Sequence, residues 1–179
     1  PSVTVEFTAS LGEEETKTTL DADNRKTLWV ETDEISINGE KFTIKEIQED
    51  GKAIFVNEGT LPEDFAAPFT AIYPYGSDGS VPAEQDAVAG NFDPKAVIET
   101  ATSDNYSLSF KNETSLLKFQ VEADCETVTI SSTSALVGKV VYKATDGTID
   151  SFATTDADKT IELAIDGGFK AGKTYYTTV

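Results

Sequence analysis

Short runs in which apolar and polar residues alternate constrain the fold of this chain more than any other feature. Successive side chains of a β-strand point to opposite faces, so strict alternation predicts a strand with one dry and one wet face. The clearest runs are Val3–Ala9, Phe42–Lys45, Leu117–Val121, Thr127–Ser131 and Ile161–Ile165. The pattern predicts an all-β protein with little helix.

Turn dipeptides separate many of these runs. Asn38-Gly39, Asp50-Gly51 and Asp146-Gly147 favour the positive φ angles of tight hairpins. We expect one hairpin around Asp50-Gly51 and another around Asp146-Gly147. Further short strands are expected at Thr27–Val30, Glu34–Ile37, Ala53–Val56, Phe69–Tyr75, Tyr106–Phe110, Lys139–Lys143, Thr148–Phe152 and Thr174–Val179.

The length of 179 residues, 39% of them hydrophobic, allows one ordinary domain with a real core. About a dozen short strands form two packed sheets more naturally than two minimal domains, so we expect a single β-sandwich over residues 1–179. Between Gly76 and Asp104 the alternation weakens and glycines and prolines punctuate a polar stretch. This stretch predicts a long crossover loop, and an internal domain boundary near 76–104 stays open as an alternative.

The charge balance excludes several partners. The chain has 32 acidic and 14 basic residues, a formal net charge of −18. Such a surface repels phosphate backbones and anionic lipid, so we expect no nucleic-acid binding. No stretch contains the roughly 18 apolar residues of a membrane-spanning helix, so no direct membrane insertion is expected.

The inventory of reactive side chains argues against an enzyme. The chain has no histidine and one cysteine, Cys125, which removes the Ser-His-Asp triad, thiolate zinc clusters and any intrachain disulfide. The segment Gly167–Thr174 formally fits a phosphate-binding loop, but a strand-like run follows it where a helix is needed. Carboxylates are plentiful, so a carbohydrate-active enzyme domain remains a distant alternative.

Two acidic segments have the spacing of a partial calcium loop. Asp21-Ala22-Asp23-Asn24 and Asp156-Ala157-Asp158 place carboxylates at alternate positions, but neither continues as an EF-hand. We expect no cofactor, with weak calcium binding as the open alternative.

Aromatic side chains are the candidates for ligand contact. Trp29 lies between Leu28 and Val30 and is expected in the core. Tyr tolerates a wet edge, so Tyr73, Tyr75 and Tyr176 are the candidate contacts to a sugar or a partner protein.

Several segments follow one another in a familiar order, and the succession covers nearly the whole chain. The segments are Val5–Ser10, Thr16–Thr18, Leu28-Trp29, Asp33–Ile37, Ala71–Tyr75, Lys111–Glu113, Leu116–Phe119 and Phe169–Tyr176. Their succession resembles the amino-terminal region of fimbrillin-like surface proteins of anaerobic Gram-negative bacteria.

The resemblance implies a transthyretin-like two-sheet antiparallel β-sandwich. It also implies export as a lipid-anchored precursor and display on the outer membrane surface. Under it Trp29, Tyr73 and Phe119 are core positions, and Gly172 is a turn residue. Thr32 stands where relatives often have glycine, and a lipidated cysteine and the usual second domain are missing, so a fragment is expected.

The preferred hypothesis is therefore a non-catalytic fimbrial subunit or accessory adhesin. Its implied partners are other fimbrial subunits, joined by donor-strand exchange. The alternative is a monomeric surface lipoprotein that binds glycans or host proteins through the tyrosines or the loop 76–104.

Overall fold

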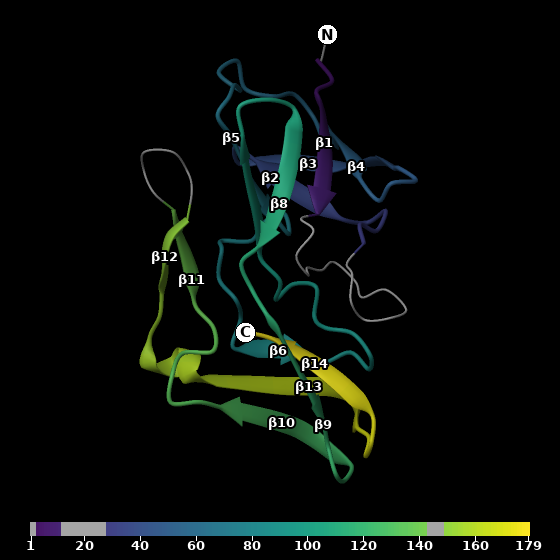
Figure 1. The fold of residues 1–179 in the computed structure, drawn as a ribbon, viewed down its shortest axis with the longest axis vertical. Helices are drawn as coiled ribbons and strands as arrows, with labels where there is room; N and C mark the ends of the chain where they lie inside the picture. The colour runs from purple at the N-terminus through teal and green to yellow at the C-terminus, as the bar shows by residue number, and fades with distance from the viewer. Residues whose placement is uncertain (1–2, 12–27, 143–148) are drawn as a thin grey trace.

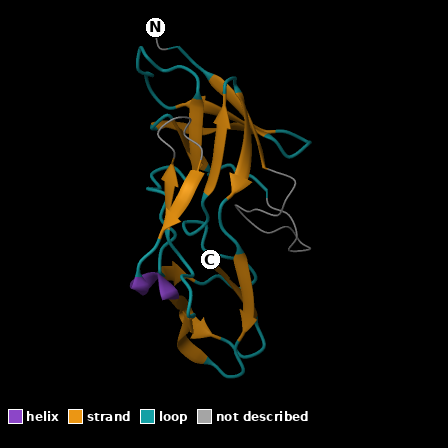
Figure 2. Cartoon of the chain, turned by 60° about the vertical axis from the view of Figure 1, so that its left-hand side comes forward, coloured by secondary structure: helices purple, strands orange, loops and turns teal. Residues whose placement is uncertain are grey.

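Strands make up most of the regular structure, in agreement with the predicted all-β class (Figures 1 and 2). The computed structural model describes residues 3–11, 28–142 and 149–179. Within these ranges the helical structure is one short 3-10 turn, η1 (Asp156–Lys159).

A closed barrel forms from strands β1 (Glu6–Leu11), β2 (Glu34–Ile37), β3 (Glu40–Ile47), β4 (Ala53–Asn57), β5 (Phe69–Tyr73), β7 (Glu99–Ser103) and β8 (Ser107–Asn112). Its order is β1-β4-β3-β2-β5-β7-β8. The β2–β3 and β3–β4 hairpins turn at Asn38-Gly39 and Asp50-Gly51, where Asn38, Gly39 and Gly51 have φ angles of 49°, 88° and 83°. The Asp50-Gly51 hairpin is thus confirmed.

The barrel closes through a parallel pair between β1 and β8, with Thr8 opposite Ser107 and Leu11 opposite Phe110. A fully antiparallel arrangement was expected, and this is wrong for β1–β8. Hairpin connections force neighbouring strands to be antiparallel, but β1 and β8 are separated by nearly the whole barrel sequence, so no short turn fixes their direction. These seven strands therefore form one closed barrel, whereas a sandwich of two separate sheets was expected.

Aromatic side chains fill the barrel. Trp29, although outside any strand, is buried and packs edge-on against Phe55, Tyr73 and Phe110. The expected core positions of Trp29 and Tyr73 are confirmed.

Most of the carboxy-terminal strands lie below the barrel in Figure 1, and one two-stranded pair rises at the left. The carboxy-terminal sheets comprise β6 (Glu84–Asp86), β9 (Leu116–Gln120), β10 (Cys125–Ser131), β11 (Lys139–Tyr142), β12 (Ile149–Ala153), β13 (Thr160–Phe169) and β14 (Thr174–Thr178). One sheet has the order β10-β13-β6, with β6 parallel to β13, and β14 pairs with β9. The β11–β12 pair is antiparallel as expected, although its Asp146-Gly147 turn lies outside the described residues.

These sheets enclose a second apolar cluster. Ile161, Leu163, Phe169 and Tyr175 are buried there, and Phe119 packs against them half-buried. Phe119 therefore packs against the core as expected, but its side chain remains partly exposed to solvent.

The predicted crossover connects the two regions. The chain leaves the barrel after β5, adds β6 to the lower sheet, and returns at β7. Val81 and Ala87 from this crossover are buried in the second cluster. The single domain over residues 1–179 and the boundary near 76–104 stay predictions.

Candidate functional site

The three candidate tyrosines lie in different environments. Tyr73 is 3% exposed in the barrel core and Tyr176 is 7% exposed beside Phe92 and Val97. Neither ring presents a free face to a ligand. Tyr75 is 42% exposed, so of the three tyrosines it is the one that a ligand or partner protein can contact.

Tyr73 has a structural role. Its hydroxyl donates a hydrogen bond to Asp33 Oδ1 at 3.1 Å, and the other oxygen of Asp33 accepts from the backbone N–H of Val30 at 2.8 Å. Burial raises the pKa of Tyr73, and the charges of Asp33 and Glu99 add to the shift. The pair anchors the segment that carries Trp29.

Tyr75 already has an internal cation against one face. The ammonium of Lys41 lies 5.5 Å from its ring centre and is itself held by Glu34 at 2.8 Å and Glu58 at 2.9 Å. Hydrogen bonds from Lys41 to these carboxylates raise its pKa. A ligand would therefore have to stack on the opposite face of the ring.

The Gly167–Thr174 segment does not form a phosphate loop. Its glycines lie in β13 and in the turn to β14, and Gly172 is a turn residue at φ +74°, as expected. The turn amides are used internally: Lys170 N–H donates to the Tyr175 hydroxyl, Ala171 N–H to Asp124, and Gly172 N–H to the Val121 carbonyl. These groups are not available to a phosphate.

The predicted calcium segment Asp156–Asp158 offers no assembled site. Asp158 caps η1 by accepting from Thr155, and Asp156 pairs with Lys159 at 2.7 Å. The segment 21–24 lies outside the described residues. Across the described ranges, no group of three or more His, Cys, Asp or Glu side chains is arranged to hold a metal ion.

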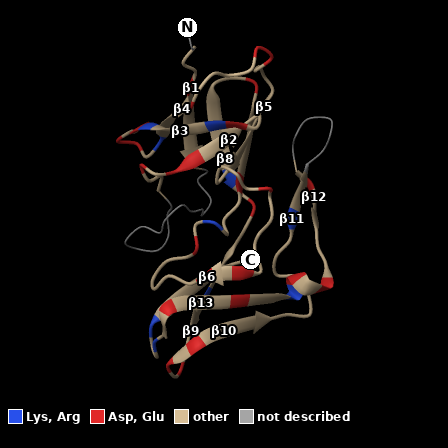
Figure 3. Cartoon of the chain, turned by 180° about the vertical axis from the view of Figure 1, so that it is seen from behind, with Lys and Arg blue, Asp and Glu red and all other residues tan. Residues whose placement is uncertain are grey.

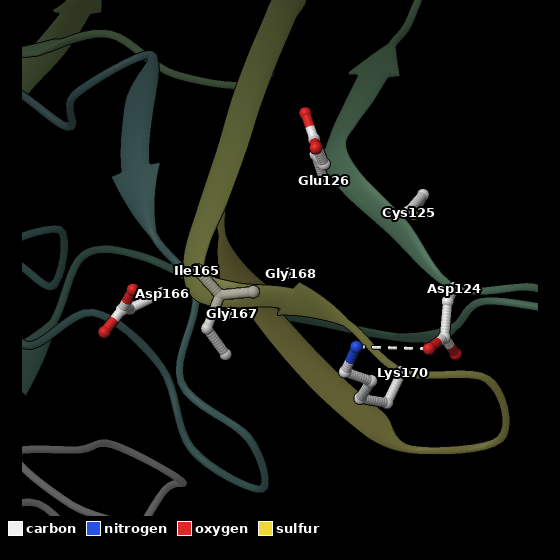
Figure 4. A pocket seen from close by; sticks show the side chains of 8 residues that line it. All are labelled: Asp124, Cys125, Glu126, Ile165, Asp166, Gly167, Gly168 and Lys170. Atoms are coloured by element: carbon white, nitrogen blue, oxygen red, sulfur yellow. Dashed lines mark hydrogen bonds and ion pairs between the residues drawn. The ribbon is translucent and has the colours of Figure 1, made fainter.

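A hollow of about 590 Å³ lies where β13 bulges away from β10 (Figure 4). Gly168 has a φ angle of +71°, and a Cβ there would lie 2.9 Å from the Cys125 carbonyl oxygen, so the close approach requires glycine. Asp124 accepts from Ala171 N–H at 2.9 Å and from Lys170 at 3.1 Å. These bonds, that to Ala171 foremost, lower the pKa of Asp124. The hollow is thus explained by the bulge.

A second groove, of about 620 Å³, lies on the outer face of the β10-β13-β6 sheet. Register places Glu162 between Thr129 and Glu84, and Ala164 between Thr127 and Asp86. Lys95 is the cation among its lining residues, and no aromatic side chain lines it. Figure 3 shows acidic residues on this sheet and on the barrel. The groove lacks the stacking rings typical of sugar sites.

The edge of β10 is the feature that sequence reasoning missed. In the β10-β13-β6 order, β10 is an edge strand within the described part of the chain. Glu162 N–H donates to the Ala83 carbonyl and Ala87 N–H donates to the Ala164 carbonyl, so these β13 residues face β6. Backbone groups alternate along a strand, so Val128 and Ile130 bond to β13 while Thr127 and Thr129 direct theirs outward.

Apolar side chains lie along the same edge. Val128, Ile130 and Cys125 are half-buried against the second cluster, as are Phe119 and Val121 of the preceding segment. The Ala171–Asp124 and Gly172–Val121 bonds tie the turn before β10 to the turn before β14, so the β9–β14 pair and the β10–β13 pair are joined at this end. Within the described part of the chain, no strand pairs with the outer side of β9 or β10, and the apolar side chains beside them are only half-buried. Alternation in the sequence shows a half-buried strand but cannot show which strand lies at an edge.

No helix in the described ranges has the length and apolar character needed to cross a bilayer. Comparison with protein-family models, with curated proteins and with solved structures found no match to this chain. The fimbrillin-like resemblance therefore stays a prediction.

Proposed function

We propose that this chain is a non-catalytic cell-surface subunit, a fimbrial component or accessory adhesin, that accepts a β-strand from a partner subunit along the edge of β10. The observation that supports this proposal is that the backbone groups of Thr127 and Thr129 point outward and meet no strand in the described part of the chain, beside half-buried Val128 and Ile130. A strand added there continues the sheet and covers the open side of the core.

Two other edges of the carboxy-terminal sheets, those of β14 and β6, are protected. On β14, the side chain of Gln85 bonds both the N–H and the carbonyl of Thr178. On β6, the N–H of Asp86 donates to Asp93 Oδ2 at 3.1 Å. Side chains that bond an edge strand block the addition of another strand, so the two edges compete poorly with β10.

The fold is compatible with the family that the sequence resembles. We regard the barrel as a transthyretin-like sandwich whose two sheets have joined along their edges. The β2–β5 junction supports this view because it rests on two residue pairs, Ser36–Ile72 and Ile37–Ala71. Export as a lipid-anchored precursor and display at the outer membrane follow from the resemblance and are part of the same proposal.

The test combines an unboiled SDS gel of surface material with edge variants. Strand exchange predicts a ladder of regularly spaced bands that collapses on heating. Thr129→Pro removes an outward N–H without touching the β13 pairing, so it should abolish the ladder while Thr129→Ala preserves it. A ladder that survives in Thr129→Pro rules out β10 as the acceptor edge, and a lone monomer band in the wild type rules out the polymer.

A second function, a monomeric surface lipoprotein that binds a glycan or host protein, is favoured by the exposed ring of Tyr75. It predicts that a glycan-array signal of the wild type disappears in Tyr75→Ala. The absence of any signal in the wild type would remove this candidate.

A further inference from the structure

A chain of aromatic rings runs through one end of the barrel and reaches the surface at Tyr106. Phe42 stacks on Phe65 at 5.8 Å between ring centres, Phe65 contacts Phe69 at 5.5 Å, and Phe69 contacts Tyr106 at 5.5 Å. Phe7 supports Tyr106 from the barrel interior at 5.1 Å. Tyr106 is nevertheless 57% exposed, so a core stack ends in an accessible ring.

The backbone that carries this ring is held in place. Asn105 N–H donates to Ser103 Oγ at 3.2 Å, and Ser107 N–H donates to Asn105 Oδ1 at 2.8 Å. The carbonyl of Tyr106 accepts from Thr8 N–H at 2.9 Å. Because this backbone is already held in place, binding of a partner to the ring should cost this protein little conformational entropy.

Apolar residues continue the surface around Tyr106. Val3 is exposed, and Leu61 and Phe65 are half-buried in the loop 58–68. The side chain of Asn57 joins these parts, because its Nδ2 donates to the carbonyls of Val3 and Gly59. We define the barrel end as residues 3–5, 58–68 and 103–107.

The charge of the barrel end is of one sign. These residues include Glu58, Glu63, Asp64 and Asp104 and contain no Lys or Arg. Glu58 pairs with Lys41. Glu63, Asp64 and Asp104 are exposed and form no ion pair within the described part of the chain.

We propose that the barrel end is a docking surface for a cationic segment of a partner protein, with an arginine or lysine side chain stacked on Tyr106. A cation over a tyrosine ring gains from the ring quadrupole, and nearby carboxylates add attraction. A second copy of this chain is a poor occupant, because each copy carries the same acidic end and a formal net charge of −18. This inference rests on different residues from those of the β10 edge.

The test is a ¹⁵N NMR titration of the intact protein with a hexa-arginine peptide at physiological salt, because the signals report where the peptide binds. The expected result is that the largest shifts fall in residues 58–68 and 103–107. Tyr106→Leu, which keeps an apolar side chain but removes the ring, should weaken binding about fivefold. Tyr106→Phe keeps the ring and should bind as the wild type does, as should Tyr75→Leu.

Three results overturn the proposal. The first is a set of shifts centred on Glu84 and Glu162, which would show that the peptide follows net charge to the sheet groove. The second is equal affinity of the wild type and Tyr106→Leu. The third is a response of the barrel end to a neutral oligosaccharide such as maltoheptaose but not to the peptide, which would make it a glycan site.

Discussion

The side chain of Gln85 on β6 bonds to Thr178 on β14 as a neighbouring peptide group would. Its Nε2 donates to the Thr178 carbonyl at 2.8 Å, and its Oε1 accepts from the Thr178 N–H at 3.0 Å. Oε1 also accepts from the Thr177 hydroxyl at 2.9 Å, and Nε2 donates to the Pro82 carbonyl at 3.0 Å. One buried amide thus connects the crossover to the last strand and closes its edge.

Gln85→Leu should lower the free energy of unfolding by about 3 kcal/mol, because a side chain of similar size leaves several buried polar groups without partners. Urea denaturation at pH 7 measures this loss. Gln85→Glu is the matched variant: it still accepts from Thr178 N–H but sets a carboxylate against the Thr178 carbonyl. Burial should raise the pKa of the new carboxyl, so its stability should recover towards pH 4. Equal stability of Gln85→Glu and wild type at pH 7 would contradict this account.

Tyr73→Phe should cost about 1–2 kcal/mol at neutral pH, because Asp33 loses a donor in a buried site. Because the pKa of Tyr73 is raised in the folded protein, this residue should also make the protein lose stability as the pH rises. In the unfolded chain Tyr73 ionises near the ordinary tyrosine pKa of 10.0, whereas in the folded protein the ring stays protonated to higher pH. The stabilisation is therefore complete below pH 10 and fades above it.

Urea titrations between pH 7 and 11 should therefore show a shallower alkaline loss of stability in Tyr73→Phe than in the wild type. Tyr75→Phe is the control, because that ring is exposed and should leave the profile unchanged. Identical alkaline slopes for wild type and Tyr73→Phe would argue against a buried, protonated Tyr73.

Asn38 combines a strained backbone with a three-way clamp. Its φ angle is 49°, its Nδ2 donates to the carbonyls of Ala66 and Pro68, and its Oδ1 accepts from Thr70 N–H. Asn38→Gly removes the clamp, whereas Asn38→Ala also adds the cost of a left-handed conformation. Thermal or urea unfolding should show that the free energy of unfolding of Asn38→Ala is about 1 kcal/mol lower than that of Asn38→Gly. The reverse order would show that φ at this position relaxes.

Asp78 should titrate near pH 2. Its hydrogen bonds from Lys139 and then Ser80 lower the pKa from 3.8 to about 2. The ion pair's contribution to stability is present above pH 3.8 and is lost as pH falls through 2, and exposure keeps it below about 1 kcal/mol. Carboxyl ¹³C NMR should show the Asp78 pKa rising in Lys139→Gln and unchanged in Lys52→Gln. A wild-type value near 3.8 would disprove the pairing in solution.

The sequence predicted strands best where their buried residues are apolar. Glu34–Ile37 was predicted with the bounds that β2 has, because Ile35 and Ile37 face the core. It missed β6 and β7, whose inward positions include Gln85 and Glu99. A buried polar residue gives no hydrophobic signal, and its burial depends on partners distant in the chain. The same limit applies to Tyr73 and Tyr176, which the sequence offers as contact residues although both rings are buried.

Local chemistry by itself determined the strand class and the hairpins at Asn38-Gly39 and Asp50-Gly51, since alternation and positive φ are properties of a few neighbouring residues. The tertiary structure decided the parallel β1–β8 closure, the open edge of β10 and the exposure of Tyr106 at the end of a buried aromatic stack. Each of these depends on which distant strands meet. That choice is made by the packing of the whole core, which no short stretch of sequence encodes.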